Sequence, residues 1–320
     1  MKFILLATSA VALTAGFASA EVTLSGDARM GIISGFDLAL ADDPLTAGVD
    51  ESLIDESDLQ FTSRARVKFT LSGSTDSGLE FGASFRADNA VGASAGTAGS
   101  VFISGAFGKL SMGDVDGAAN AAVGQVSGVG LTGLGDLNEV TYIANGGATN
   151  GGFGSQDDPS ALYEYSTGDL TIYASATNPS GVSDAYAIAA KYVIGDYAVS
   201  LGYEDQRLVG GFKETQLLLG ATASFGSATV KAVYGNIGYN DGSADQKQMA
   251  VSVDYVVDAL TVTGFYMDSE DAAPSIFGGE RAYGLGAAYD LGGGASVVGG
   301  YVKNQTTDQD AYDLGVSMSF

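Results

Sequence analysis

The sequence predicts an all-β protein, a 16-stranded antiparallel transmembrane β-barrel with a long third loop folded inward. Three observations support this fold class. Extended segments with period-two alternation recur along the chain, and short turns between them alternate with long polar loops. No stretch after residue 20 reaches the run of about 18 apolar residues that a membrane helix needs. The composition agrees, with 47 Gly, 16 Tyr and 15 Phe but only 4 Pro.

Residues 1–20 are expected to be a secretory signal peptide. Lys2 gives a positive start, residues 3–15 form an apolar run, and residues 18–20 provide a small-residue cleavage site. The apolar run is too short to span a bilayer comfortably, which argues against a membrane anchor. The mature chain, residues 21–320, is then expected to form a single barrel domain.

The first three expected strands each have one polar face and one apolar face. A charged face three strands wide cannot be the dry core of a sandwich, but it can line a wet lumen while the apolar face turns to lipid. The polar faces carry Glu21, Thr23, Ser25, Asp27 and Arg29 in the first strand, Gln60, Thr62, Arg64, Arg66, Lys68 and Thr70 in the second, and Glu80, Ser84, Arg86 and Asp88 in the third.

Turns and loops give the strand count. Seven short turns and eight long loops join 16 strands, an even number that returns both ends of the chain to the rim with the short turns. The turns lie near residues 73–78, 107–108, 168–169, 195–196, 226–227, 257–258 and 291–294. The loops lie near residues 33–59, 89–98, 115–159, 178–183, 205–212, 237–245, 268–280 and 304–310. A barrel of this strand count encloses an aqueous channel.

The last ten residues form an expected strand that ends on an aromatic residue. Tyr312, Leu314, Val316, Met318 and Phe320 share one face, and this ending resembles the signature of bacterial outer-membrane proteins. We expect Glu21 and Phe320 to lie close together where the first and last strands close the barrel.

Aromatic residues lie near the expected strand ends. They predict girdles at the two membrane interfaces, although ordinary β-propensity is an alternative explanation. The set is Phe61, Phe107, Tyr163, Tyr197, Phe225, Tyr255, Tyr289, Tyr301 and Tyr312.

The loop at residues 115–159 is the longest connection, and a loop of this length is usually functional. Its Ala-rich segment, residues 118–122, is expected to form a short helix after an Asp cap. Folded outward, the loop would be a surface feature. Folded inward, it would narrow the lumen.

Long segments resemble the general bacterial porins of the Rhodobacter type. The matching segments are Glu21–Ile32, Ser63–Ala87, Val101–Asp114, Tyr283–Val302 and Asp313–Phe320. The resemblance implies a trimer of 16-stranded barrels in the bacterial outer membrane. It also implies that the third long loop folds inward to form an eyelet, with acidic side chains facing a basic wall.

The resemblance and the strand alternation together select the eyelet residues. The basic wall is expected to consist of Arg29, Arg64, Arg66, Lys68 and Arg86, and the acidic loop residues are Asp114, Asp116, Asp136 and Glu139. Which of the four acids reach the lumen stays open. The arginines could instead pair with acids only to hold lumen side chains in place.

The expected function is a general diffusion porin, a water-filled channel for small hydrophilic solutes and ions. Opposed charges in a narrow gap would orient water and dipolar solutes and disfavour apolar ones. Alternatives are a substrate-specific channel or a non-conducting structural or adhesive barrel. The expected partners are outer-membrane lipid, lipopolysaccharide and two further copies of the chain, with an interface near Ala28 and Ala65.

Other functional classes are disfavoured. The chain contains no His and no Cys, which removes the commonest nucleophile–base pairs, so an enzyme is not expected. A net charge of −24 argues against nucleic acid. No cofactor is required, although Ca²⁺ could bind the acidic loops at residues 42–43, 50–51 and 157–158.

Overall fold

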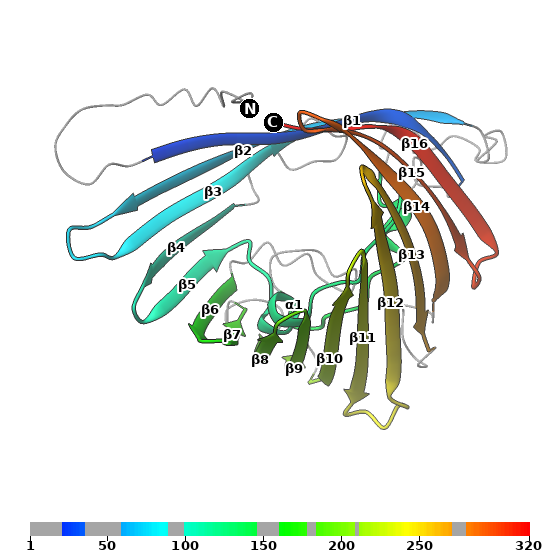
Figure 1. Ribbon diagram of the computed structural model, residues 1–320. Helices are drawn as coiled ribbons and strands as arrows, with labels where there is room; N and C mark the ends of the chain where they lie inside the picture. Colours follow the sequence, from blue (N-terminus) through cyan, green and yellow to red (C-terminus); the bar gives the residue numbers. More distant parts are fainter. Residues whose placement is uncertain are drawn as a thin grey trace, which may run out of the picture.

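The computed structural model describes residues 21–35, 59–88, 99–145, 160–177, 184–208, 211–270 and 280–320. The expected signal peptide and the three acidic loop pairs considered for Ca²⁺ lie outside these ranges. Within them, sixteen strands form one closed antiparallel barrel, in which each strand pairs with the next and β1 pairs with β16 (Figure 1). The predicted fold class and strand count are confirmed.

The strands have the following bounds. They are β1 Glu21–Ser34, β2 Gln60–Ser74, β3 Glu80–Asp88, β4 Gly99–Gly105, β5 Gly108–Gly113, β6 Ser160–Thr167, β7 Leu170–Ala176, β8 Asp184–Ile194, β9 Tyr197–Arg207, β10 Lys213–Phe225, β11 Ala228–Tyr239, β12 Gln246–Val257, β13 Leu260–Ser269, β14 Arg281–Gly292, β15 Ala295–Asn304 and β16 Gln309–Ser319.

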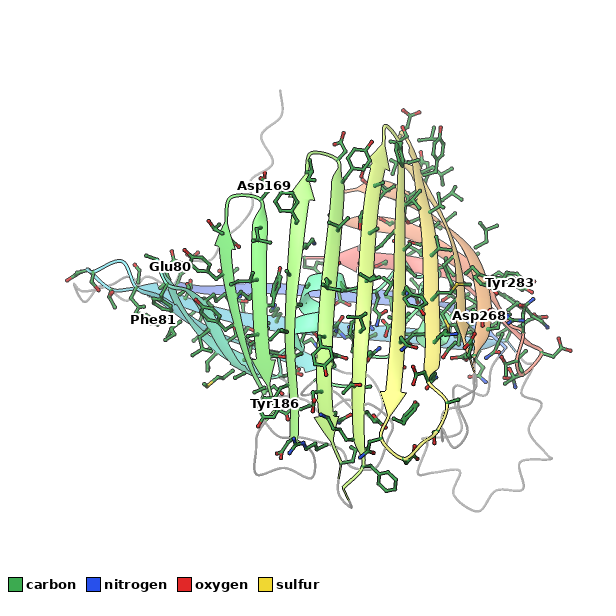
Figure 2. All side chains as sticks on the ribbon, turned by 90° about the horizontal axis from the view of Figure 1, so that it is seen from below. Glu80, Phe81, Asp169, Tyr186, Asp268 and Tyr283 are labelled. Atoms are coloured by element: carbon green, nitrogen blue, oxygen red, sulfur yellow. The ribbon has the colours of Figure 1, made fainter. Side chains whose placement is uncertain are left out.

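Short turns and long connections occupy opposite rims, as the alternation of turn lengths predicts. Figure 2 shows Asp169, in the tight turn between β6 and β7, at one rim, and Tyr186, near the start of β8, toward the other. Glycine enables several of these turns. Gly168, for example, adopts φ 59°, a left-handed conformation that costs glycine little.

The seam between β1 and β16 closes the barrel, but not at the residue that we expected. The Phe320 N–H donates to the Gly26 carbonyl at 2.9 Å, and the Gly26 N–H donates to the Phe320 carbonyl at 3.1 Å. Glu21 instead lies opposite Ser72 of β2, so the expected closeness of Glu21 and Phe320 is wrong. Strands in a closed barrel tilt and pair with a stagger, so β1 begins well beyond the end of β16.

The described part of the third long loop, residues 114–145, is called the inner loop. It lies inside the barrel, as Figure 1 shows, so the inward alternative is the correct one. Its helix α1, Ala118–Val123, packs against β7, β8, β9 and β10, and its short 3₁₀ turn η2, Leu134–Asp136, lies against β15 and β16.

The predicted short helix is confirmed, but its predicted Asp cap is wrong. Gly117 is the N-cap residue and offers no side chain. The first helical N–H groups are satisfied from outside the helix, since Ala118 N–H donates to the Ser175 hydroxyl at 2.8 Å. Asp116 accepts a hydrogen bond from the Asn120 side chain at 3.2 Å instead.

No helix in the described part of the chain has the length and apolar character needed to cross a membrane.

The core lies between the inner loop and the inner face of β8–β16. Leu218 of β10 illustrates the arrangement, because it is fully buried under the loop while Leu217 and Leu219 are each 47% exposed on the outer face. Burial of this apolar wall is the favourable contribution that holds the loop inside. The inward residues of the wall in these two clusters are Ala185, Ala187, Ala189, Leu218, Val233, Ala250, Phe265, Met267, Ala282, Val302 and Ala311.

Candidate functional site

The basic wall, defined as Arg29, Arg64, Arg66, Lys68 and Arg86, lies on β1, β2 and β3. Arg29 lies directly opposite Arg64, and Lys68 lies directly opposite Arg86. Cross-strand partners share one face of a sheet. Arg29 donates a hydrogen bond from Nη1 to the Leu131 carbonyl of the inner loop at 3.4 Å, so this shared face is the lumen face.

Two arginines of the basic wall, Arg29 and Arg64, lie opposite each other. Like charges directly opposite each other across two strands repel. Arg64 forms an ion pair with Asp27, with 3.0 Å between Nη2 and Oδ2, and the two side chains are 21% and 44% exposed. The Nε atoms of Arg29 and Arg64 are buried, and neither has a hydrogen-bond partner within the described residues. The lumen face of β1 and β2 therefore holds two adjacent guanidinium groups, with Asp27 as the acid that pairs with Arg64.

The four predicted acids lie on the inner loop in two separate pairs. Asp114 and Asp116 lie before α1, Asp136 and Glu139 lie in and just after η2, and all four are exposed. One pair therefore lies before α1 and the other after it along the inner loop.

The pKa values of two of these acids reflect their position inside the barrel. Desolvation by the surrounding protein inside the barrel, although the side chain still reaches solvent, and then the nearby charge of Asp114 raise the pKa of Asp116. Partial burial, and then the charge of Asp136, raise the pKa of Glu139 in the same way. Asp116 and Glu139 therefore lose their protons at a higher pH than isolated carboxylates do.

Buried polar side chains of β9, β10 and β12 anchor the return limb of the inner loop. Ile143 N–H donates to Glu204 Oε2 at 2.8 Å and lies 3.1 Å from Gln216 Oε1. The Thr141 carbonyl accepts from Gln216 Nε2 and from Gln248 Nε2, each at 2.7 Å. Glu204, Gln216 and Gln248 are at most 2% exposed. They supply hydrogen-bond partners to backbone N–H and C=O groups of the loop that would otherwise be buried without a partner, which is energetically costly.

Two further carboxylates hold the outgoing limb. The Ser127 hydroxyl donates to Asp254 Oδ2 at 2.6 Å, and the Leu131 and Thr132 N–H groups donate to Asp313 at 2.8 and 2.7 Å. None of these anchors is among the site residues expected from the sequence. The available signal was the period-two alternation, which places each of these polar side chains at an inward position of its strand.

The inner loop therefore occupies part of the lumen. It lies against the inner face of β8–β16 and meets the basic wall at Arg29. The described residues contain no group of three or more acids arranged to hold a metal ion. The geometry suits the passage of solutes along a polar wall.

Comparison with known proteins agrees with this geometry. A family model of Gram-negative porins matches residues 7–317. A porin of Rhodobacter capsulatus is 39% identical over 331 aligned positions, which cover 94% of this chain and 100% of the relative. A porin of Fuscovulum blasticum is 24% identical, with coverage of 94% and 100%. A porin structure refined at 1.8 Å resolution is similar with a TM-score of 0.75 at 37% identity, over 94% of this chain and 100% of that one. The chain belongs to the Gram-negative porin family.

Proposed function

We propose that this protein is a general diffusion channel for small hydrophilic solutes and ions across the bacterial outer membrane. Two observations support the proposal: five basic side chains share the lumen face of β1–β3, and a loop inside the closed barrel carries four exposed acids. Family membership and the barrel fold support the location in the outer membrane. The proposal includes a channel role and no catalytic one.

The mechanism is electrostatic. Water fills the lumen beside the basic wall, and the charges across the constriction create a field perpendicular to the pore axis. Screening inside a narrow gap between protein walls is weaker than in bulk water, so the field acts on each passing molecule. Dipolar solutes orient and pass, whereas apolar solutes disturb the ordered water and are disfavoured.

Single-channel recording in planar bilayers tests this function. We expect large ohmic conductance steps, with a reversal potential in a salt gradient that shifts toward cation preference in Arg29→Gln/Arg64→Gln. The matched control is Lys109→Gln/Glu164→Gln, which removes a neutral ion pair of 3.4 Å from β5 and β6 and should leave selectivity unchanged. Inserted protein that does not conduct would favour a structural or adhesive barrel. Saturable conductance of one solute would favour a substrate-specific channel.

We further propose that three copies associate through the outer faces of β1–β5. All 16 tyrosines follow residue 141, and the chain has no Trp. Strands β1–β5 therefore carry neither of the two residues that are enriched where proteins meet lipid head groups. Small residues also meet on this face, where Ala28 lies opposite Ala65. Phe61 is 95% exposed in the single chain, which favours cover by a neighbouring copy.

Ala65→Arg tests the interface. We expect loss of detergent-resistant trimers, because a charge would enter an apolar contact between copies. The control is Ala221→Arg on the outer face of β10, which should reduce membrane insertion but leave the trimers that form resistant. Resistant Ala65→Arg trimers would place the interface elsewhere.

Export by the expected signal peptide and contact with lipopolysaccharide complete the proposal. The mature protein should begin at Glu21, which intact-mass measurement would check. Bound Ca²⁺ stays an optional feature of the acidic loops, and equilibrium dialysis of the purified protein with Ca²⁺ would test it.

A further inference from the structure

The tip of the inner loop, Val129–Leu131, lies against a group of glycines that we call the glycine socket. The socket consists of Gly31, Gly284, Gly286, Gly300 and Gly315, from β1, β14, β15 and β16. Two pairs of these glycines lie directly opposite each other across neighbouring strands, Gly31 with Gly315 and Gly286 with Gly300.

The socket exists because these positions have no side chain. A Cβ atom at Gly300 would lie 2.6 Å from the Gly130 Cα, and one at Gly286 would lie 2.8 Å from the Val129 Cβ. Real Cβ atoms do not approach other atoms this closely in a packed interior. Any larger residue at Gly300 would therefore displace the backbone of the tip.

Leu131 fills the other half of the socket. Its Cδ2 atom lies 2.6 Å from the place that a Cβ would take at either Gly31 or Gly315. Val129 and Leu131 are only 4% and 8% exposed, so the tip is buried on an inner wall that otherwise faces a wet channel. The shape of the socket matches this part of the loop.

Asp313 of β16 adds a directional bond to this fit. Its carboxylate is 3% exposed and accepts three hydrogen bonds from the tip: from Leu131 N–H at 2.8 Å, Thr132 N–H at 2.7 Å and the Thr132 hydroxyl at 2.8 Å. Hydrogen bonds to a buried carboxylate are stronger than neutral ones, and a carboxylate at this depth needs such partners. The buried carboxylate of Asp313 therefore needs the donors of the tip, and the N–H groups of the tip need the carboxylate as their acceptor.

The tip is also the place where the inner loop meets the basic wall. Leu131 donates its N–H to Asp313 and accepts from Arg29 through its carbonyl, at 3.4 Å. A shift of this residue would move the edge of the constriction relative to Arg29 and the arginine opposite it.

We propose that Asp313 and the glycine socket act as a lock that fixes the tip and thereby sets the size limit of the pore. The proposal rests on the proposed channel function. Asp313 is a positioning residue here, because it acts on solutes only through the loop. With the tip held in this way, the opening of the pore keeps one size, because the loop does not move in and out of the lumen.

Two variants test the lock by different routes. Asp313→Asn keeps the side-chain shape but replaces one acceptor oxygen with a donor that faces N–H groups. Gly300→Ala leaves the carboxylate intact and places a Cβ atom in the space that the Gly130 backbone occupies. The controls are Glu80→Gln, an inward carboxylate near the short-turn rim, and Gly264→Ala on β13, where a Cβ would meet only ordinary contacts at 3.7 and 3.8 Å.

Amide hydrogen exchange on the full-length protein in micelles gives the first measurement. We expect the amides of residues 129–132 to exchange at least about tenfold faster in both variants. In Asp313→Asn, tip N–H groups lose a hydrogen-bond acceptor, and in Gly300→Ala the tip backbone loses the space that it packs into. The amides of α1 and both control variants should keep the parent rates. Equal protection of the tip in parent and variants would overturn the lock.

Liposome swelling gives the second measurement. In both variants the entry rate of a large oligosaccharide relative to a monosaccharide should rise above the parent ratio. A faster-exchanging tip with an unchanged ratio would show that the lock does not set the size limit, and the proposal would fail. A parent that admits no sugar would instead refute the channel function itself, and the lock with it.

Discussion

Leu134 offers the sharpest test of how the inner loop is held. It is one of the largest fully buried side chains, with 0% exposure, and it packs in the cluster between the loop and the wall. It also has φ 48°, a left-handed conformation that residues with a Cβ rarely adopt. A residue tolerates such a backbone when its surroundings stabilise it, so packing of this side chain must offset the strain.

The expected effect of Leu134→Ala follows from its burial. Truncation of a fully buried leucine costs about 3 kcal/mol, with a range of roughly 2.7–5 kcal/mol. The strain of the left-handed backbone, about 1 kcal/mol, is the same for Leu and Ala and does not change this difference. Because about 1.4 kcal/mol corresponds to a factor of ten, local opening of the loop should become at least about a hundredfold more frequent.

The loss should be local, and the assay must resolve it from the barrel. Hydrogen exchange followed by peptide mass spectrometry should show faster exchange in residues 129–140, while the strands of the barrel keep their protection. Thermal unfolding of the barrel should change little, because the strand ladders do not contain Leu134.

Two comparisons make the reasoning refutable. Leu134→Met keeps the volume and should cost less than about 1.5 kcal/mol. Leu285→Ala removes a side chain that is 60% exposed on the outer wall and should leave the loop unchanged. If Leu134→Ala exchanged at the parent rate, packing of this residue would not hold the loop, and the polar anchors alone would.

Three further outcomes are expected. Deletion of Phe320 removes both hydrogen bonds to Gly26 at the seam, so the heat-resistant barrel band on unheated gels should weaken. The pKa values of Asp116 and Glu139 are raised, so both acids are neutralised at a higher pH than free carboxylates. As the pH is lowered, any contribution of these two acids to cation preference, read from the reversal potential, should therefore be lost at a higher pH than carboxylates of ordinary pKa would give. Gly202→Val places side-chain atoms where α1 packs, since even a Cβ there would lie 2.7 Å from a helix Cβ, so channel noise should increase.

The strands and their count could be predicted because their signals are local. Period-two alternation and turn residues act over a few positions, and they identified the seven turns without knowledge of the loops. The pairing of Phe320 could not be predicted in this way. It opposes Gly26 rather than Glu21, because the stagger of a closed barrel is set by all sixteen strands together.

The basic wall and the anchors differ in the same respect. Arg29 and Arg64 could be assigned to one face from alternation in two adjacent strands, and their register places them directly opposite each other. Glu204 and Asp313 have the same alternation signal as any lumen carboxylate. Their role depends on loop residues that lie 61 and 182 positions away in the sequence, which no local pattern reports.

The division of the lumen into two walls explains why the inner loop lies against one side of the barrel. The inner face of β8–β16 carries many apolar side chains whose exposure to water would be unfavourable, and the loop covers them. A loop buried there must satisfy its own polar backbone, and Glu204, Gln216, Gln248 and Asp313 supply the partners. The inner face of β1–β3 is charged and favours contact with water, and the loop meets it at Arg29. The same hydrophobic and hydrogen-bonding requirements therefore dock the loop against β8–β16 rather than against the charged strands.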